Sequence, residues 1–188
     1  ELTDSDFEKI GKAVELLEKS NFFIDDTSAL SPSEILSRSR KLKREFPELG
    51  LVVLDYLQLM RADNSNPSRV NEMSEISRAT KALAKELDVP VIALSQLNRA
   101  SETRTNKEPI MADLRDSGAL EQDADLVIFP FRPEFHEPTP ENKGIAKVIV
   151  AKHRNGETGN ILLHWAARYT SFEAVSYTHL RAHETRPY

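Results

Sequence analysis

Two apolar segments that each end in polar residues constrain the fold of this chain most strongly. They span residues 51–60 and 89–99, and they carry Asp55 and Gln96 at the ends of their apolar runs. Short continuous apolar runs are typical of strands buried in a parallel sheet. Parallel strands present polar groups at their carboxyl edge, where α/β folds bind ligands. The sequence therefore predicts an α/β fold with a nucleotide and its metal ion between a carboxylate and an amide.

Composition narrows the class of protein. The chain has 188 residues, a length that suits one domain with a real core, and 29% of its residues are charged, which favours a soluble globular protein. It contains no cysteine, which favours a reducing cytoplasm and excludes thiolate metal sites. No apolar run approaches the roughly 20 residues of a membrane span. The net charge of -5 argues against a generic polyanion-binding surface but leaves a localised nucleic-acid site open.

Periodicity and capping residues predict the elements of the first half. Apolar residues at helical spacing predict a helix over 4–19, and 21–25 is expected to be a short strand. Ser31-Pro32-Ser33-Glu34 predicts a capped helix start, because serine caps, proline fits the first turn and glutamate closes a capping box. That helix is expected to stop before Pro47. Residues 51–59 are then expected to be a strand.

The second half continues the alternation of strands and helices and ends in a hairpin around Asn155-Gly156. The expected elements are a loop at 61–69, a helix to residue 87, a strand at 90–95, a loop at 99–112, a helix at 117–123, and strands at 125–131, 145–152 and 160–165. This order predicts a mostly parallel sheet with flanking helices and a C-terminal β-hairpin.

Asp55 and Gln96 are the candidate residues at the predicted strand ends. A carboxylate there can hold Mg²⁺ through water beside the phosphates of ATP. The alternative is that Asp55 caps a helix or ends a strand in solvent. The Gln96 amide can orient water or sense a γ-phosphate without carrying charge. The alternative is an ordinary polar strand end.

Two further candidate sites are basic. Lys152 and Arg154 lie on one face of a predicted strand, an arrangement that suits a phosphate on a neighbouring subunit or simply a solvated edge. Residues 113–118 form a predicted loop that leads into a helix, where Arg115 and backbone N–H groups can meet a DNA phosphate. The alternative is a helix cap by Ser117. The sequence contains no Gly-x-x-x-x-Gly-Lys-Ser/Thr loop to cradle phosphates.

Five motifs occur in an order that closely resembles the C-terminal motor domain of bacterial replicative DNA helicases of the DnaB type. The five are Asp-Tyr-Leu-Gln-Leu-Met at 55–60, Ser-Gln-Leu-Asn-Arg at 95–99, Asp-Leu-Arg-Asp-Ser-Gly at 113–118, Glu-Gln-Asp-Ala-Asp at 121–125 and Lys-His-Arg-Asn-Gly at 152–156. The similarity extends to about Glu173. Five ordered motifs are far more specific than any one of them.

The resemblance implies a RecA-like ATPase that assembles as a homo-hexamer around single-stranded DNA. ATP and Mg²⁺ would bind between subunits, and hydrolysis would drive 5′ to 3′ unwinding. The resemblance also implies a primase and a helicase loader as partners. It assigns Asp55 to Mg²⁺ as the Walker B aspartate and Gln96 to coupling of the γ-phosphate with the DNA loops.

The remaining roles come from the same resemblance. Lys152 and Arg154 correspond to cations that reach the neighbour's ATP, with Arg154 as the arginine finger. Arg115, Asp116 and Gly118 correspond to the loop that grips the DNA backbone. The loop at 61–69 corresponds to a second loop facing the channel.

Two departures from the family pattern set limits on these expectations. Residues 1–175 resemble part of the motor, without its phosphate-binding loop and catalytic glutamate, so we expect the chain alone neither to hydrolyse ATP nor to unwind DNA. We also expect it to aggregate, because unpaired strand edges would be exposed. Residues 176–188 have no apolar periodicity and resemble a translated sequencing adaptor, an artefact that we exclude from the fold.

Two other functions remain open at this point. One is another RecA-like ATPase, such as a recombinase or a phage primase-helicase, although the Ser-Gln-Leu-Asn-Arg and Lys-His-Arg-Asn-Gly pair favours the replicative helicase. The other is a non-catalytic module that binds DNA or assembles with partner subunits.

Overall fold

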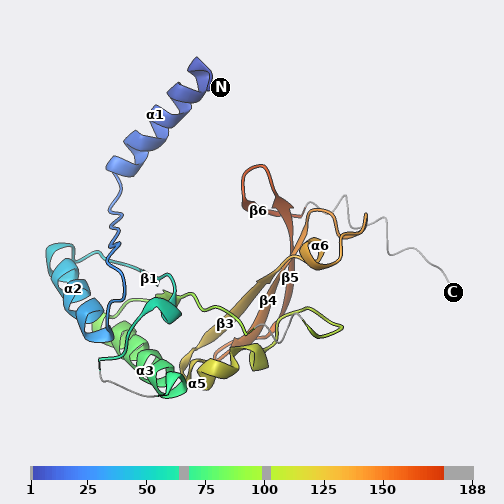
Figure 1. The fold of residues 1–188 in the computed structure, drawn as a ribbon. Helices are drawn as coiled ribbons and strands as arrows, with labels where there is room; N and C mark the ends of the chain where they lie inside the picture. Colours follow the sequence, from blue (N-terminus) through green and yellow to red (C-terminus); the bar gives the residue numbers. More distant parts are fainter. Residues whose placement is uncertain (1, 64–67, 99–102, 176–188) are drawn as a thin grey trace.

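The computed structural model describes residues 2–63, 68–98 and 103–175, and the side chains of 115–117 are not described. The predicted tail at 176–188 therefore lies outside the described residues, as do Arg99 and the middle of the 61–69 loop. A small parallel sheet with two helices leads into a longer antiparallel sheet, and the N-terminal helix stands apart from both (Figure 1).

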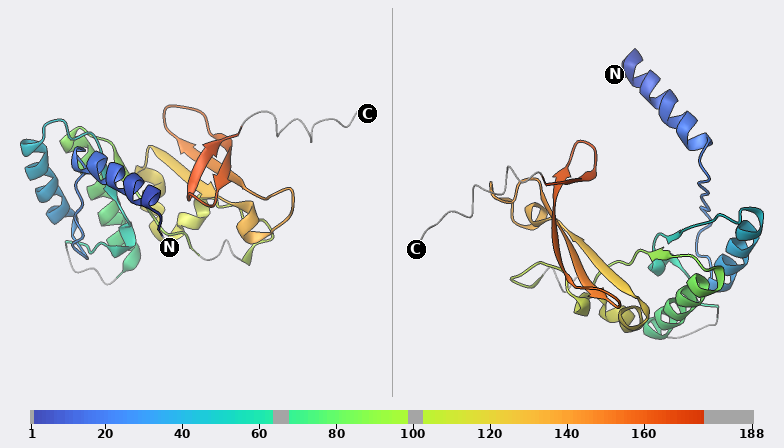
Figure 2. Two further views of the ribbon diagram at one scale, coloured as in Figure 1. Left: turned by 90° about the horizontal axis from the view of Figure 1, so that it is seen from above. Right: turned by 180° about the vertical axis from the view of Figure 1, so that it is seen from behind.

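Helix α1 (Asp4–Glu18) confirms the predicted helix and has an unusual environment. Thr3 caps it, and Thr3 and Asp6 form a reciprocal capping box. None of its residues is buried, so its apolar positions, including Phe7 and Leu17, remain exposed. Two views show α1 projecting away from the other elements (Figures 1 and 2). Within the described residues, α1 is held by its Thr3 cap and by ion pairs among its own side chains and with Lys19.

The segment after α1 is extended, and the prediction of a strand at 21–25 is wrong. A strand needs a neighbour for its backbone groups, which a local pattern cannot reveal. Phe23 instead packs on Phe46, with the ring centroids 4.6 Å apart. The Arg38 guanidinium donates to Asp25 and, together with Thr27, lowers the pKa of that carboxyl to about 2.

Helix α2 (Pro32–Glu45) begins as predicted, with Ser31 and Glu34 in a capping box and proline in the first turn. It packs with α3 (Arg69–Leu87) on one face of the parallel pair β1 (Val52–Leu54) and β2 (Val91–Ala93). Side chains alternate along a strand, so the other face is formed by Val53 and Ile92. Both of these side chains are about half exposed.

The prediction of a strand over 51–59 is wrong beyond Leu54. The chain leaves the sheet there and forms a 3-10 turn, η1 (Leu57–Leu59). The turn buries Leu57 completely, in a cluster with Met73 and Ile76 of α3. Burial of this side chain under α3 competes with further pairing along β1 and decides the path of the chain.

The second sheet is antiparallel, with the order β3-β4-β5-β6. Its strands are β3 (Leu126–Phe131), β4 (Ile145–His153), β5 (Gly159–Ala166) and β6 (Ser171–Ala174), and three short helical segments flank it, η2 (Met111–Ser117), α5 (Gly118–Asp123) and α6 (Pro133–His136). Burial alternates along β3, where Val127 and Phe129 pack with Leu114 of η2. Helix α5 lies at one end of this sheet, beside α3, and α6 lies at the other end (Figure 1).

The predicted α/β fold and the β4–β5 hairpin are confirmed. Among the described strands, parallel pairing is confined to β1 and β2, whereas the four later strands pair antiparallel. Within the same residues, no helix has the length and apolar character needed to cross a membrane.

Candidate functional site

Asp55 and Gln96 leave the parallel pair at the same edge. Leu54 pairs with Ala93, and two backbone hydrogen bonds of 2.9 Å continue the ladder, from Leu94 N to Leu54 O and from Leu57 N to Leu94 O. The side chains of Asp55 and Gln96 are exposed and have no hydrogen-bond or ion-pair partner within the described part of the chain. The carboxyl edge therefore presents an unengaged carboxylate and an unengaged amide.

Gln58 bridges the two strand ends, a role that the sequence reasoning missed. Its Nε2 donates to Ser95 Oγ at 2.9 Å and to Gln96 O at 3.2 Å, and its Oε1 accepts from Gln96 N at 3.2 Å. Arg69, at the start of α3, donates to Gln58 O at 2.7 Å. The amide thereby fixes the backbone that carries Gln96. A glutamine in a 3-10 turn gives no sequence signal for such a contact.

Lys152 and Arg154 both lie against the end of α5. Lys152 Nζ donates to the carbonyl oxygens of Glu121 and Gln122, at 2.6 and 3.1 Å, which are C-terminal carbonyls of that helix. Arg154 Nη1 lies 3.1 Å from Asp125 Oδ1. The structure thus places the two predicted cations next to each other, at the end of β4.

Asp125 also contacts Lys81 of α3, through its other carboxylate oxygen. The hydrogen bond from Lys81 is the main reason that the pKa of Asp125 lies below its ordinary value, and the charges of Arg154 and Lys152 add to it. The folded-state pKa is below that of the unfolded chain, near 3.9. These contacts therefore stabilise the fold above about pH 4 and are lost as the pH falls through the folded-state pKa.

Replacing Lys81 with methionine should raise the pKa of Asp125 toward the ordinary 3.8, because it removes the largest cause of the lowering. Arg154→Gln should produce a smaller rise, since the charge of Arg154 is a smaller cause of the lowering than the hydrogen bond from Lys81. Carbon-13 NMR titration of the carboxyl group measures both values. Lys85→Met, one turn further along α3, serves as the control and should leave the titration unchanged.

The loop before α5 is built around a buried carboxylate. The Asp113 side chain is 2% exposed, and its Oδ2 accepts from Arg104 Nη2 at 2.7 Å and from Ile110 N at 2.9 Å. The backbone of η2 then leads through Arg115 and Asp116, whose side chains lie outside the described residues, to Gly118 at the start of α5. The structure places these three predicted DNA-binding positions at the junction of η2 and α5.

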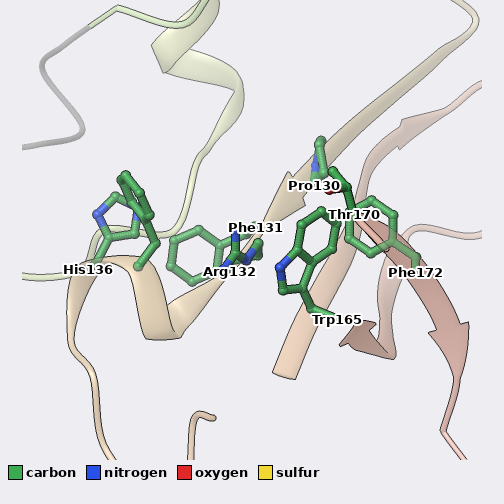
Figure 3. A pocket seen from close by; sticks show the side chains of 8 residues that line it. Pro130, Phe131, Arg132, His136, Trp165, Thr170 and Phe172 are labelled. Carbon is green, nitrogen blue, oxygen red and sulfur yellow. The ribbon is translucent and has the colours of Figure 1, made fainter. Parts of the chain in front are cut away.

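An aromatic pocket of about 510 Å³ lies at the far end of the antiparallel sheet, and sequence reasoning missed it as well. Figure 3 shows the Arg132 guanidinium over the ring of Trp165, 4.5 Å from its centroid. The Phe172 ring packs edge-on against the Trp165 indole, with the ring centroids 4.9 Å apart. No spacing pattern marks these residues, because Arg132 follows β3, whereas Trp165 and Phe172 come from β5 and β6. The pocket offers flat apolar faces and one cation.

Comparison with known proteins gives a consistent result. Residues 1–174 match the family described as the DnaB-like helicase C terminal domain. The chain is 49% identical over 174 residues to the replicative DNA helicase DnaB of Buchnera aphidicola, covering 92% of this chain and 37% of that protein. It is also 49% identical over 176 residues to the Pasteurella multocida protein of the same name, covering 93% and 38%. The chain thus spans about two fifths of the length of these relatives.

Solved structures agree with the sequence comparison. One structure, described as an ATPase domain, superposes with a TM-score of 0.89 and 41% identity, covering 94% of this chain and 62% of that one. A DnaB-like replicative helicase, described with its interactions with primase, superposes with a TM-score of 0.88 and 41% identity, covering 94% and 42%.

Proposed function

The chain belongs to the DnaB-like helicase C-terminal domain family, and from this premise we propose that it forms part of the motor of an ATP-dependent replicative DNA helicase. Its relatives are replicative DNA helicases whose chains are more than twice as long as this one. The observation that carries the proposal is the pair of strand ends with Asp55 and Gln96, both exposed and unengaged at one edge of a parallel sheet. Ligands of open α/β sheets bind at that edge.

Asp55 is proposed to serve Mg²⁺ beside the phosphates of ATP. A single carboxylate fits this ion, because Mg²⁺ in nucleotide sites keeps several waters and takes its other oxygens from the phosphates. Asp55 follows β1 directly and has no described protein partner that would compete for its oxygens. When bound, the metal ion neutralises charge that develops on the phosphates.

Gln96 is proposed to connect the nucleotide with the DNA loops. Its side-chain amide is unengaged while its backbone is fixed by Gln58, so it can hydrogen-bond a phosphate oxygen or a water without first breaking a contact. The link from Arg69 to Gln58 joins this position to the start of α3, immediately after the 61–69 loop. This chain of hydrogen bonds supports a role for Gln96 in passing a change at the nucleotide to the loop before α3.

Lys152 and Arg154 are proposed to act on the ATP of a neighbouring subunit, with Arg154 as the arginine finger. Lys152 lies about seven strand residues, roughly 23 Å, from Ile145, which pairs with His164 beside Trp165 of the aromatic pocket at the other end of the sheet. That pocket suits the flat base of a nucleotide, since Trp165 and Arg132 offer stacking faces. Separate ends favour two nucleotides, one on each side of a subunit, which supports head-to-tail assembly, and we propose that this assembly is a homo-hexameric ring.

Arg115, Asp116 and Gly118 are proposed to contact the backbone of single-stranded DNA. A motor that moves along any sequence should hold phosphates rather than read bases. The proposal extends to 5′ to 3′ travel, to a cytoplasmic location, and to primase and helicase loader as partners. One structural relative is described with its interactions with primase.

The experiment joins the upstream part of the Pasteurella multocida relative to residues 1–175 of this chain, and we refer to this product as the fusion helicase. It should hydrolyse ATP faster with single-stranded DNA than without, and it should unwind a forked duplex. The 188-residue chain alone should do neither, because it lacks the phosphate-binding loop. A soluble ring-shaped fusion helicase without ATPase activity would contradict the proposal and favour a non-catalytic assembly module. Strand exchange in place of unwinding would favour a recombinase.

A further inference from the structure

Asp125 holds Arg154 at two points. The backbone N of Arg154 donates to Asp125 O at 2.8 Å, where β3 and β4 begin to pair, and the guanidinium lies 3.1 Å from Asp125 Oδ1. Arg154 follows the last residue of β4 and opens the turn toward Asn155-Gly156. A long side chain at a turn has many rotamers, so a partner just before the adjacent strand β3 restricts where its guanidinium lies.

Helix α3 in turn fixes the carboxylate of Asp125. Lys81 engages Oδ2, which leaves Oδ1 facing Arg154. One helical turn earlier, the buried Ser77 donates to Asp123 Oδ2 at 2.6 Å. The segment that leads from α5 into β3 is therefore attached to a packed helix on both sides of Ala124. The lowered pKa of Asp125 is consistent with a carboxylate that stays ionised in this setting.

Building on the proposed function, we propose that Asp125 is a positioning residue for the arginine finger. Held by Lys81, it keeps the Arg154 guanidinium directed along the end of β4, where a neighbouring subunit's phosphates would meet it. Lys152 is kept beside it by the carbonyl groups of α5. The two cations are thus presented together before any nucleotide arrives.

The alternative is an ordinary surface ion pair that only adds stability. The side chains of Arg154 and Asp125 are 51% and 56% exposed, so solvent screens the pair and its contribution to folding is small. A positioning role predicts an effect on the rate that exceeds the effect on stability and depends on Arg154. These two effects distinguish a positioning role from an ordinary surface ion pair.

The test uses Asp125→Asn in the fusion helicase, a change that keeps the shape and removes the charge. The kcat for ATP hydrolysis should fall about tenfold with KM within about twofold, because displacing a reacting group by 1 Å costs up to about 100-fold in rate. In an Arg154→Ala background the same substitution should change nothing further, since its effect passes through that arginine. Asp125→Glu should recover part of the loss.

The matched control is Glu157→Gln, which removes an exposed carboxylate from the same hairpin turn and should leave kcat unchanged. An unchanged kcat for Asp125→Asn, or an equal loss with and without Arg154, would overturn the proposal. If Asp125→Asn fails to fold, Lys81→Met replaces it as the test. It should lower kcat about threefold, because the Asp125 carboxylate then loses its contact with α3. An inactive parent fusion helicase contradicts the proposed function, whereas an active parent with a fully active Asp125→Asn variant contradicts this inference alone.

Discussion

Replacing Arg154 with alanine should lower the kcat of the fusion helicase for ATP hydrolysis by about 1,000-fold, the lower end of what an arginine finger contributes. The guanidinium supplies charge and two parallel donors to a phosphoryl group in its transition state. Arg154→Lys should recover little of the rate, because an ammonium group is a point charge that cannot form the two-donor contact. A coupled ATPase assay at saturating DNA measures the kcat of the fusion helicase and of its Arg154→Ala and Arg154→Lys variants.

The action of Arg154 across a subunit boundary has its own test. Subunits with Arg154→Ala and subunits with Asp55→Asn should each be inactive alone. Mixed rings should regain part of the activity, because some interfaces then combine an intact Asp55 with an intact Arg154. Mixed rings that stay inactive, although native mass spectrometry shows that subunits have exchanged, would place the two residues in one subunit's site.

Asp113→Ala should lower the free energy of unfolding by about 3 kcal/mol, because it breaks a buried charge pair and leaves donors without their acceptor. Arg104 Nη2 and Ile110 N both donate to the same carboxylate oxygen. Asp113→Asn can keep both bonds through its own oxygen, so a loss of about 1 kcal/mol is expected there. Urea unfolding followed by the fluorescence of Trp165, the single tryptophan of the chain, measures both.

Asp26→Ala is the control for this comparison, since Asp26 is exposed and makes no described contact. Its effect should stay within about 0.5 kcal/mol. Equal stabilities of Asp113→Ala and the original chain would show that the buried carboxylate does not hold the loop. Equal losses for the alanine and asparagine variants would assign the effect to charge rather than to hydrogen bonding.

Features that depend on neighbouring residues could be predicted from the sequence. The start of α2 follows from Ser31 and Glu34, and the β4–β5 hairpin follows from a short turn between two apolar strands. The meeting of Asp55 and Gln96 at one edge follows from the rule that parallel strands share a carboxyl edge. Each of these signals is local or follows from a general topological rule.

The remainder required the tertiary structure. The strand expected at 21–25 has no partner, and β6 is too short for its alternation to stand out. Lys81 and Asp125 are 44 positions apart, and only the packing of α3 against α5 joins them. The bridge from Gln58 to Gln96 arises because burial of Leu57 turns the chain back over β2. Such contacts are consequences of packing and carry no sequence signature.

The isolation of α1 makes its helix–coil equilibrium a local matter. A single helix of 15 residues pays the full cost of nucleation and is marginal in water when nothing packs on it. The Thr3 cap and the pairs of Glu8 with Lys12 and Glu15 with Lys19 work against that cost, and salt weakens the pairs. The helix content of α1 therefore responds to ionic strength and temperature independently of the sheets, and the segment behaves thermodynamically as a tethered peptide.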